Sequence, residues 1–164
     1  MSTQDNAVVV GLGEMKVSGE AHDVLVCLGL GSCVALCYHD PVARVGAVAH
    51  IVLPSSEGRA LGSPAKFADT AVPALIEAVT KAGGLKARLT VRIAGGAQMT
   101  MASEASGIFS IGRSNVEATK QALRRVGLHV RGEDTGGSAG RTVRLSAGSG
   151  EVVVNTQVSS TRNL

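Results

Sequence analysis

The apolar residues of this chain come in short β-branched runs separated by glycine-containing turns, and this pattern constrains the fold most. Only two stretches show helical spacing. The order of runs is mixed, without the strict strand–helix alternation of a doubly wound parallel sheet. The sequence therefore predicts an α+β fold, a layered α/β/β sandwich of mixed, mostly antiparallel sheets with both helices on one side. The predicted strands are 7–10, 22–28, 33–38, 44–53, 88–94, 128–133, 142–145 and 151–154.

The two predicted helices differ in how clearly their ends are marked. In 65–82 apolar residues recur at helical spacing, and a glycine pair follows. Pro73 lies inside this stretch, where it is tolerated only in a first turn and otherwise predicts a kink. The second helix is predicted to begin at Ser114, which forms a capping box with Glu117, and to end at Gly127.

The length of 164 residues predicts one domain over 1–164, with frayed tails at 1–6 and 157–164. The longest charge-free apolar stretch, Val24–Tyr38, is interrupted by glycines and is shorter than the ~20 residues of a membrane span. No basic residue precedes the first apolar segment, as a secretory signal would require. We therefore expect a cytoplasmic protein that does not insert into a membrane.

Charge and aromatic content argue against nucleic-acid binding. Aromatic residues make up 2% of the chain (Tyr38, Phe67 and Phe109), which leaves no base-stacking surface. The net charge is +3, but residues 1–82 carry −3 and residues 83–164 carry +6. The basic residues are dispersed, so a surface for acidic partners and a solvated helix face both fit, and the solvated face is the simpler interpretation.

The three cysteines, Cys27, Cys33 and Cys37, are expected to be thiols because their number is odd and the chain shows no export signal. Along a strand, Cys33 and Cys37 would be ~13 Å apart, too far to share one metal ion. We expect no metal site and no cofactor. Cys37, between apolar neighbours, is interpreted as a small core residue.

Cys33 follows a glycine-rich turn, Gly29 to Ser32, that brings backbone close to the sulfur with little side-chain cover. Such a turn leaves room for a substrate and frees backbone N–H groups to face an oxyanion. An acyl-transfer nucleophile requires this arrangement. A thiol with the ordinary pKa of about 8.5 is mostly protonated at neutral pH, so it also needs a base, normally histidine.

His50 is the strongest candidate for that base, because it is the single polar side chain in an apolar strand. If 33–38 and 44–53 pair as a hairpin around Asp40-Pro41, His50 lies opposite Cys33, with Cβ atoms ~5 Å apart. A core histidine bonded to a backbone carbonyl is the alternative, and the residues alone leave both interpretations open.

Several motifs in order resemble the CheD family, the chemoreceptor glutamine deamidases. The motifs are Leu28-Gly-Leu-Gly-Ser-Cys33, Asp40-Pro41, Ala49-His50, Leu53-Pro54, Phe67-Ala-Asp69, Ala94-Gly-Gly-Ala97 with Met99, Asn115-Val-Glu117 and Glu133-Asp-Thr-Gly-Gly137 with Arg141. The resemblance covers about residues 11–154. It implies a cysteine amidohydrolase that converts glutamines of methyl-accepting chemotaxis receptors to glutamate, with the family's layered α/β/β fold.

By position, the resemblance implies that Cys33 is the nucleophile, His50 its base, and the Ser32 and Cys33 amides the oxyanion donors. Many family members carry a catalytic threonine six residues before the nucleophile, where this chain has Cys27. If a backbone carbonyl orients His50, this change is harmless. If the threonine hydroxyl orients it, the thiol is a poorer partner.

The family also implies a CheC-type phosphatase as partner. The change at Cys27 keeps open a second hypothesis, a binding module with weak or no catalysis that regulates this phosphatase and receptor signalling. A thiol protease or acyltransferase is a third.

Overall fold

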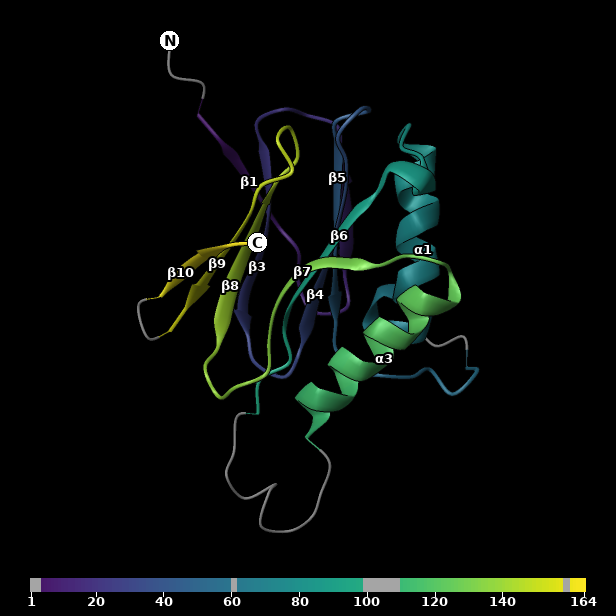
Figure 1. The fold of residues 1–164 in the computed structure, drawn as a ribbon, viewed down its shortest axis with the longest axis vertical. Coiled ribbons are helices and arrows are strands. Elements are labelled where there is room, and N and C mark those ends of the chain that lie inside the picture. The colour runs from purple at the N-terminus through teal and green to yellow at the C-terminus, as the bar shows by residue number, and fades with distance from the viewer. Residues whose placement is uncertain (1–3, 60–61, 99–109, 158–159) are drawn as a thin grey trace.

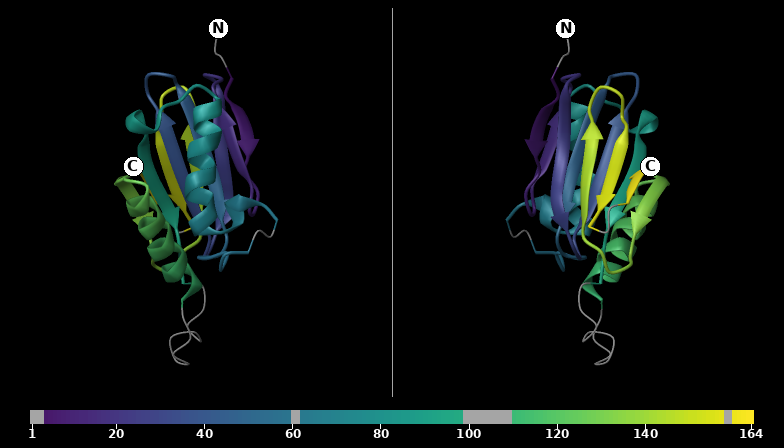
Figure 2. Two further views of the ribbon diagram at one scale, coloured as in Figure 1. Left: turned by 90° about the vertical axis from the view of Figure 1, so that its right-hand side faces the viewer. Right: turned by 90° about the vertical axis from the view of Figure 1, so that its left-hand side faces the viewer.

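The protein was analysed as a computed structural model, which describes residues 4–59, 62–98, 110–157 and 160–164. The described elements stack in three layers, a helix layer and two five-stranded sheets (Figures 1 and 2). The predicted layered α/β/β sandwich is therefore confirmed.

The outer sheet has the strand order β1-β3-β8-β9-β10. Strands β1 and β3 run parallel, and the other neighbours are antiparallel. The bounds are β1 Asn6–Val9, β3 Asp23–Leu30, β8 Arg141–Ser146, β9 Val152–Thr156 and β10 Thr161–Asn163.

The central sheet has the order β2-β5-β4-β6-β7 and separates the outer sheet from the helices. Strands β6 and β7 run parallel and the other neighbours antiparallel, so both sheets are mixed and mostly antiparallel, as predicted. The bounds are β2 Met15–Ser18, β4 Val34–Asp40, β5 Val45–Ile51, β6 Thr90–Gly95 and β7 Val130–Thr135.

Two helices, α1 (Ala68–Lys81) and α3 (Ile111–Arg125), cover one face of the central sheet. Two short 3₁₀ turns, η1 (Pro64–Lys66) and η2 (Lys86–Arg88), stand beside them. Helix α1 starts later than predicted, because Phe67 has extended backbone angles between η1 and the helix. Pro73 nevertheless lies beyond the first turn of α1, in its interior.

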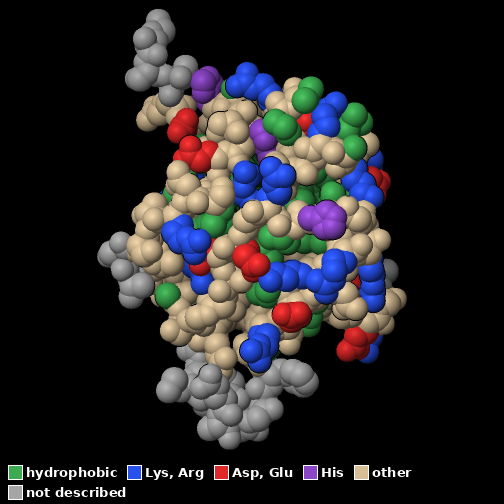
Figure 3. All heavy atoms as spheres, in the orientation of Figure 1, with side chains coloured by type: hydrophobic (Ala, Val, Ile, Leu, Met, Phe, Trp, Pro, Cys, Tyr) green, Lys and Arg blue, Asp and Glu red, His purple; other side chains and the backbone are tan. Residues whose placement is uncertain are grey.

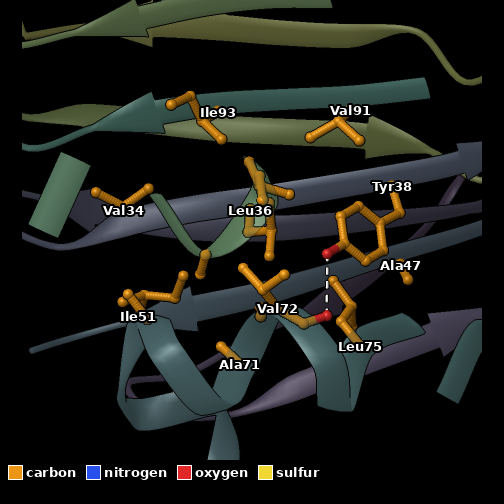
Figure 4. Packing of buried hydrophobic residues seen from close by; sticks show 14 of the residues in the cluster. Val34, Leu36, Tyr38, Ala47, Ile51, Ala71, Val72, Leu75, Val91 and Ile93 are labelled. Atoms are coloured by element: carbon orange, nitrogen blue, oxygen red, sulfur yellow. Dashed lines mark hydrogen bonds between the residues drawn. The ribbon is translucent and has the colours of Figure 1, made fainter. Parts of the chain in front are cut away.

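Two apolar cores result from these layers. The helix-side core joins α1 and α3 to the central sheet, and within it the Tyr38 hydroxyl donates to the Val72 carbonyl at 3.0 Å (Figure 4). The between-sheet core lies on the opposite face of the central sheet and includes Val48, Leu145 and Val154. Strand β4 is buried on both faces, which explains its near-continuous apolar sequence.

The structure differs from the sequence-based expectations at three further places. Strand β2 was not predicted, because four residues with two apolar positions give a weak pattern. Thr161–Asn163 in the expected frayed tail form β10 by pairing with β9. Helix α3 begins after Ser110, not at Ser114, since the Ser110 side chain accepts from the Arg113 N–H at 3.2 Å. Phe109 and Met99 lie outside the described residues.

Candidate active site

Cys33 lies in the turn between β3 and β4, at one end of the sandwich. Strand β3 is irregular before this turn, with a register shift between Cys27 and Leu30, and Gly29 there has a φ of 59°. Cys33 is partly exposed, while Cys27 and Cys37 are buried. Partial burial raises the pKa of the Cys33 thiol, so the thiol form is favoured until a base takes its proton.

Residues 95–97, at and just after the end of β6, hold the Cys33 turn in place. The Gly96 N–H donates to the Cys33 carbonyl and the Ala97 N–H to the Gly31 carbonyl, both at 2.8 Å. At Gly95, with a φ of 113°, an added Cβ would lie 2.2 Å from the Cys33 carbonyl oxygen. A side chain at this position would therefore displace the turn. The sequence analysis had no particular role for this glycine pair.

His50 lies on β5 and is 3% exposed. Its Nδ1 lies 3.0 Å from the Val10 carbonyl oxygen, which can only accept, so Nδ1 carries the proton in the neutral ring. The Nε2 atom is buried and has no hydrogen-bond partner among the described residues. The ring is thus oriented by backbone, with an unused lone pair on Nε2.

The hairpin of β4 and β5 pairs His50 with Ala35, two residues from the predicted partner Cys33. The reason is a four-residue turn: the Asp40 carboxylate accepts from the Val42 and Ala43 N–H groups, and pairing closes at Asp40 opposite Val45. Directly opposite positions are therefore excluded for Cys33 and His50.

Cys33 and His50 nevertheless belong to the same side of the central sheet. Position 33 is two residues from Ala35, and side chains two apart along an extended chain share a face. Cys33 packs against the between-sheet core, and His50 follows the same face as Val48. Continued by one residue beyond β4, this register makes position 33 diagonal to position 50, and diagonal positions have separations of ~7–8 Å, with Cβ atoms somewhat closer.

The Ser32 and Cys33 N–H groups are the predicted oxyanion donors. Within the described residues, neither N–H makes a loop or turn hydrogen bond, whereas both carbonyl groups accept one. The chemistry that this arrangement permits is attack by a thiol beside a histidine lone pair and backbone donors.

Cys27, the third predicted site residue, lies on β3 opposite Val143 of β8, inside the between-sheet core. Burial is the main cause that raises the pKa of the Cys27 thiol, and the nearby Cys37 and Cys33 thiols raise it further. The acceptor on His50 Nδ1 is the Val10 carbonyl, so orientation of this ring does not require a hydroxyl at position 27.

Asn115 is a further polar residue at the site. It is fully buried on α3, and its Nδ2 donates to the Ser32 and Val52 carbonyls, both at 2.9 Å. The sequence analysis noted it only within a motif. An available signal was an asparagine beside the buried stripe of a helix, where a polar group needs partners.

The loop after β5 is anchored at the start of α1. The Asp69 carboxylate accepts from the Ser56 N–H at 3.0 Å and from the Ser56 hydroxyl at 2.9 Å.

In the part of the chain that the structure describes, no group of three or more His, Cys, Asp or Glu side chains is arranged as a metal site would require. No helix within the described ranges has the length and apolarity to cross a membrane.

Comparison with known proteins identifies the family. Residues 52–156 match the family model described as "CheD chemotactic sensory transduction". The chain is 47% identical over 146 residues to the "Chemoreceptor glutamine deamidase CheD" of Thermotoga maritima, covering 89% of each chain. It is 46% identical over 149 residues to the "Probable chemoreceptor glutamine deamidase CheD" of Symbiobacterium thermophilum, covering 90% of each.

The "Probable chemoreceptor glutamine deamidase CheD" of Methanococcus maripaludis is 46% identical over 145 residues, which is 88% of this chain and 92% of the relative. These alignments span nearly the whole length of all four proteins, and the family model covers more than half of this one. The chain belongs to the CheD family.

Proposed function

We propose that this protein is a chemoreceptor glutamine deamidase, which hydrolyses glutamine side chains of methyl-accepting chemotaxis receptors to glutamate and releases ammonia. The proposal rests on a partly exposed thiol, Cys33, and on His50, whose ring is oriented by a backbone carbonyl and whose Nε2 has no hydrogen-bond partner among the described residues. The names of relatives 46–47% identical over about 90% of the chain support the reaction class.

The reaction begins with proton transfer from the Cys33 thiol to His50 Nε2. The sulfur attacks the side-chain carboxamide carbon and forms a C–S bond, and the Ser32 and Cys33 N–H groups stabilise the oxyanion. The C–N bond then breaks, and the protonated His50 transfers its proton to the departing nitrogen, which leaves as ammonia.

Water completes the cycle. His50 Nε2 accepts a proton from the water, whose oxygen attacks the thioester carbon. The C–S bond breaks, the protonated His50 returns its proton to the departing sulfur, and the glutamate product is released with the Cys33 thiol restored. All steps use side-chain and backbone groups of this chain, so the proposed reaction needs no cofactor.

The raised pKa of Cys33 makes the histidine essential in this proposal, because the thiolate is scarce without a base nearby. Cys27 is assigned to packing beneath the nucleophile, since the Val10 carbonyl provides the acceptor for His50 Nδ1. We assign the activity to one domain that spans residues 1–164. We place the protein in the cytoplasm, because it would have to reach the cytoplasmic segments of the receptor there. A CheC-type phosphatase is a candidate partner.

The test is ammonia release from a receptor cytoplasmic domain, with the accompanying mass increase of about 1 Da that amide hydrolysis requires. We expect activity in the wild type and its loss in Cys33→Ala and in His50→Ala. Cys37→Ala is the matched control, because Cys37 is a buried thiol on the neighbouring strand. A Cys33→Ala protein that still releases ammonia would overturn the proposal.

The second candidate is a binding module with weak or no catalysis, and the cysteine at position 27 in place of the family's usual threonine is the observation behind it. It predicts receptor binding without ammonia release by the wild type. If the wild type binds receptor but releases no ammonia, Cys27→Thr is the next test: ammonia release by this variant would assign a catalytic role to position 27, and no release would favour the binding module.

A further inference from the structure

One carboxamide connects the two segments that carry the proposed catalytic pair. Asn115 Nδ2 donates to the carbonyl of Ser32, the residue before Cys33, and to that of Val52, two residues after His50. These contacts join residues 83 and 63 positions apart in the chain. The nucleophile turn and the end of β5 are therefore fixed to the same side chain of α3.

The role of this side chain lies in its two N–H groups. Both neighbours are carbonyl oxygens, which only accept, so the atom that faces them must be nitrogen. The Oδ1 atom is buried and has no partner among the described residues. A buried acceptor without a donor lowers stability, and stability alone does not account for an asparagine here.

Helix α3 holds Asn115 at a fixed distance from the turn. An added Cβ at Gly112, one turn before Asn115, would lie 2.4 Å from the Ala97 carbonyl oxygen and 2.5 Å from that of Gly96. The backbone of α3 thus lies directly against the glycines that bind the Cys33 turn. Asn115 projects from a rigid element whose position is set by the same glycines.

The planar peptide group carries this positioning to the reaction centre. In a trans peptide the carbonyl and the following N–H point in opposite directions. Because Asn115 holds the Ser32 carbonyl toward α3, the Cys33 N–H points away from α3. We propose that Asn115 is a positioning residue: its carboxamide fixes the Ser32–Cys33 peptide so that the Cys33 N–H faces the oxyanion of the reacting glutamine.

This inference rests on the proposed deamidase function and predicts a defect in kcat. In Asn115→Ala the Ser32–Cys33 peptide is free to rotate, so an oxyanion donor is misplaced in the transition state. We expect kcat to fall on the order of 10- to 100-fold, with KM within about twofold of the wild type. The rate at which iodoacetamide alkylates Cys33 should stay within about twofold, because alkylation forms no oxyanion.

The experiment measures kcat and KM for ammonia release from a receptor cytoplasmic domain, together with the alkylation rate. Asn115→Asp is a second variant, with nearly the same volume and no amide donors, so its defect cannot come from a cavity. Thr119→Val is the matched control: Thr119 is fully buried on the same helix, and its hydroxyl donates only to the Asn115 backbone carbonyl at 2.7 Å. Its kcat should remain within about twofold of the wild type.

Four outcomes would overturn the inference. One is wild-type kcat in both Asn115 variants. Another is a change of Cys33 alkylation as large as the change in kcat, or a Thr119→Val defect of equal size, either of which would indicate general loosening. The last is failure of both variants to fold, which would make Asn115 a residue of stability. A wild type that releases no ammonia refutes the deamidase proposal instead.

Discussion

At the scale of single residues, the three cysteine thiols are chemically identical, and their different surroundings decide which of them can react. Cys27 is 0% and Cys37 2% exposed, whereas Cys33 is accessible from the turn after β3. Burial raises the pKa of Cys37 to about 12 despite the opposing charge of Arg92. A buried thiol with a raised pKa is a poor nucleophile, because a reagent cannot reach it and because little of it is present as thiolate.

We therefore expect iodoacetamide to add one carboxamidomethyl group to the native protein, on Cys33, and three after unfolding in denaturant. The rate should rise with pH, because the Cys33 thiolate reacts and its pKa is raised. Intact mass and peptide mapping measure both. Cys33→Ala is the control, and modification of Cys27 in the native protein would contradict the burial described here.

Residue chemistry also decides how much of the site was predictable. Cys33 and His50 stand out in the sequence, one after a glycine turn and the other as a polar residue in an apolar strand. Val10 and Asn115 do not, because they contact His50 and Ser32 across 40 and 83 residues of chain. Such partners are determined by tertiary packing and leave no local pattern.

At the scale of elements, the start of α3 is set by a contact that the capping pattern missed. Ser114 and Glu117 have the spacing of a capping box, but Ser110 is the N-cap. Glycine is a poor helix former, so Gly112 in the first turn of α3 gives no local signal of the earlier start. Its missing side chain is instead what lets the first turn of α3 lie against the carbonyls of Gly96 and Ala97.

Ser110→Ala should therefore lower the free energy of unfolding by about 1 kcal/mol through loss of the N-cap bond to Arg113. Ser114→Ala, inside the helix, should not lower it by a comparable amount, because alanine favours helix. Urea denaturation of both variants measures the difference. A larger loss of unfolding free energy in Ser114→Ala than in Ser110→Ala would instead support the capping box that the sequence predicts at Ser114.

At the scale of the whole molecule, His39 connects the two sheets. It lies on β4 of the central sheet, is 3% exposed, and its Nε2 donates to the Ala147 carbonyl after β8 at 2.8 Å. Burial lowers the pKa of His39, and nearby Arg92 and Arg44 also lower it, against the opposing effects of the Ala147 bond and Asp40. The folded protein thus favours the neutral ring.

Because the pKa is lower in the folded than in the unfolded protein, the unfolded chain binds the proton first on acidification. The free energy of unfolding should fall as the pH is lowered through about 6.5, by at most about 1.4 kcal/mol per pH unit for one proton. Thermal unfolding between pH 8 and 5 measures this. His39→Gln, which keeps an N–H donor and does not titrate, should have a flatter profile.

The carboxylates with lowered pKa values, Asp23, Asp40 and Glu133, contribute at more acidic pH, since their ordinary pKa values are 3.8 and 4.5. Burial alone would raise the pKa of Asp40, but hydrogen bonds from Arg88 and three backbone N–H groups outweigh it. An equally steep profile in His39→Gln between pH 8 and 5 would exclude His39 as the cause.

The charge asymmetry of the sequence also appears on the surface. Figure 3 shows Lys and Arg side chains spread over the face that includes α3 and β7, with Asp and Glu side chains among them. Lys120 on this face pairs with Glu133 at 2.9 Å, while Arg124 and Arg125 are exposed and have no carboxylate partner within the described residues. Unpaired cations of this kind attract an acidic partner over a Debye length of about 8 Å at 0.15 M salt.

If receptor binding uses this face, neutralising Arg124 and Arg125 to Gln should weaken binding several-fold at low salt and reduce its salt dependence. The dissociation constant for a receptor cytoplasmic domain between 50 and 300 mM NaCl measures both. Lys16 and Lys81, each already paired with a glutamate, provide a matched double substitution. If the Arg124 and Arg125 substitutions leave the salt dependence of receptor binding unchanged, this face is solvated surface that does not bind the receptor.

The sequence by itself determined the layers, most of the strands, and the proposal of Cys33 as nucleophile with His50 as its base. These features follow from local apolar spacing and from residue chemistry that is visible in a short window. Only the tertiary structure decided the register that makes Cys33 and His50 diagonal neighbours, the Val10 carbonyl on His50, and the Asn115 bridge. Each depends on a backbone group whose position is fixed by packing between distant segments, and backbone groups are the same in every sequence.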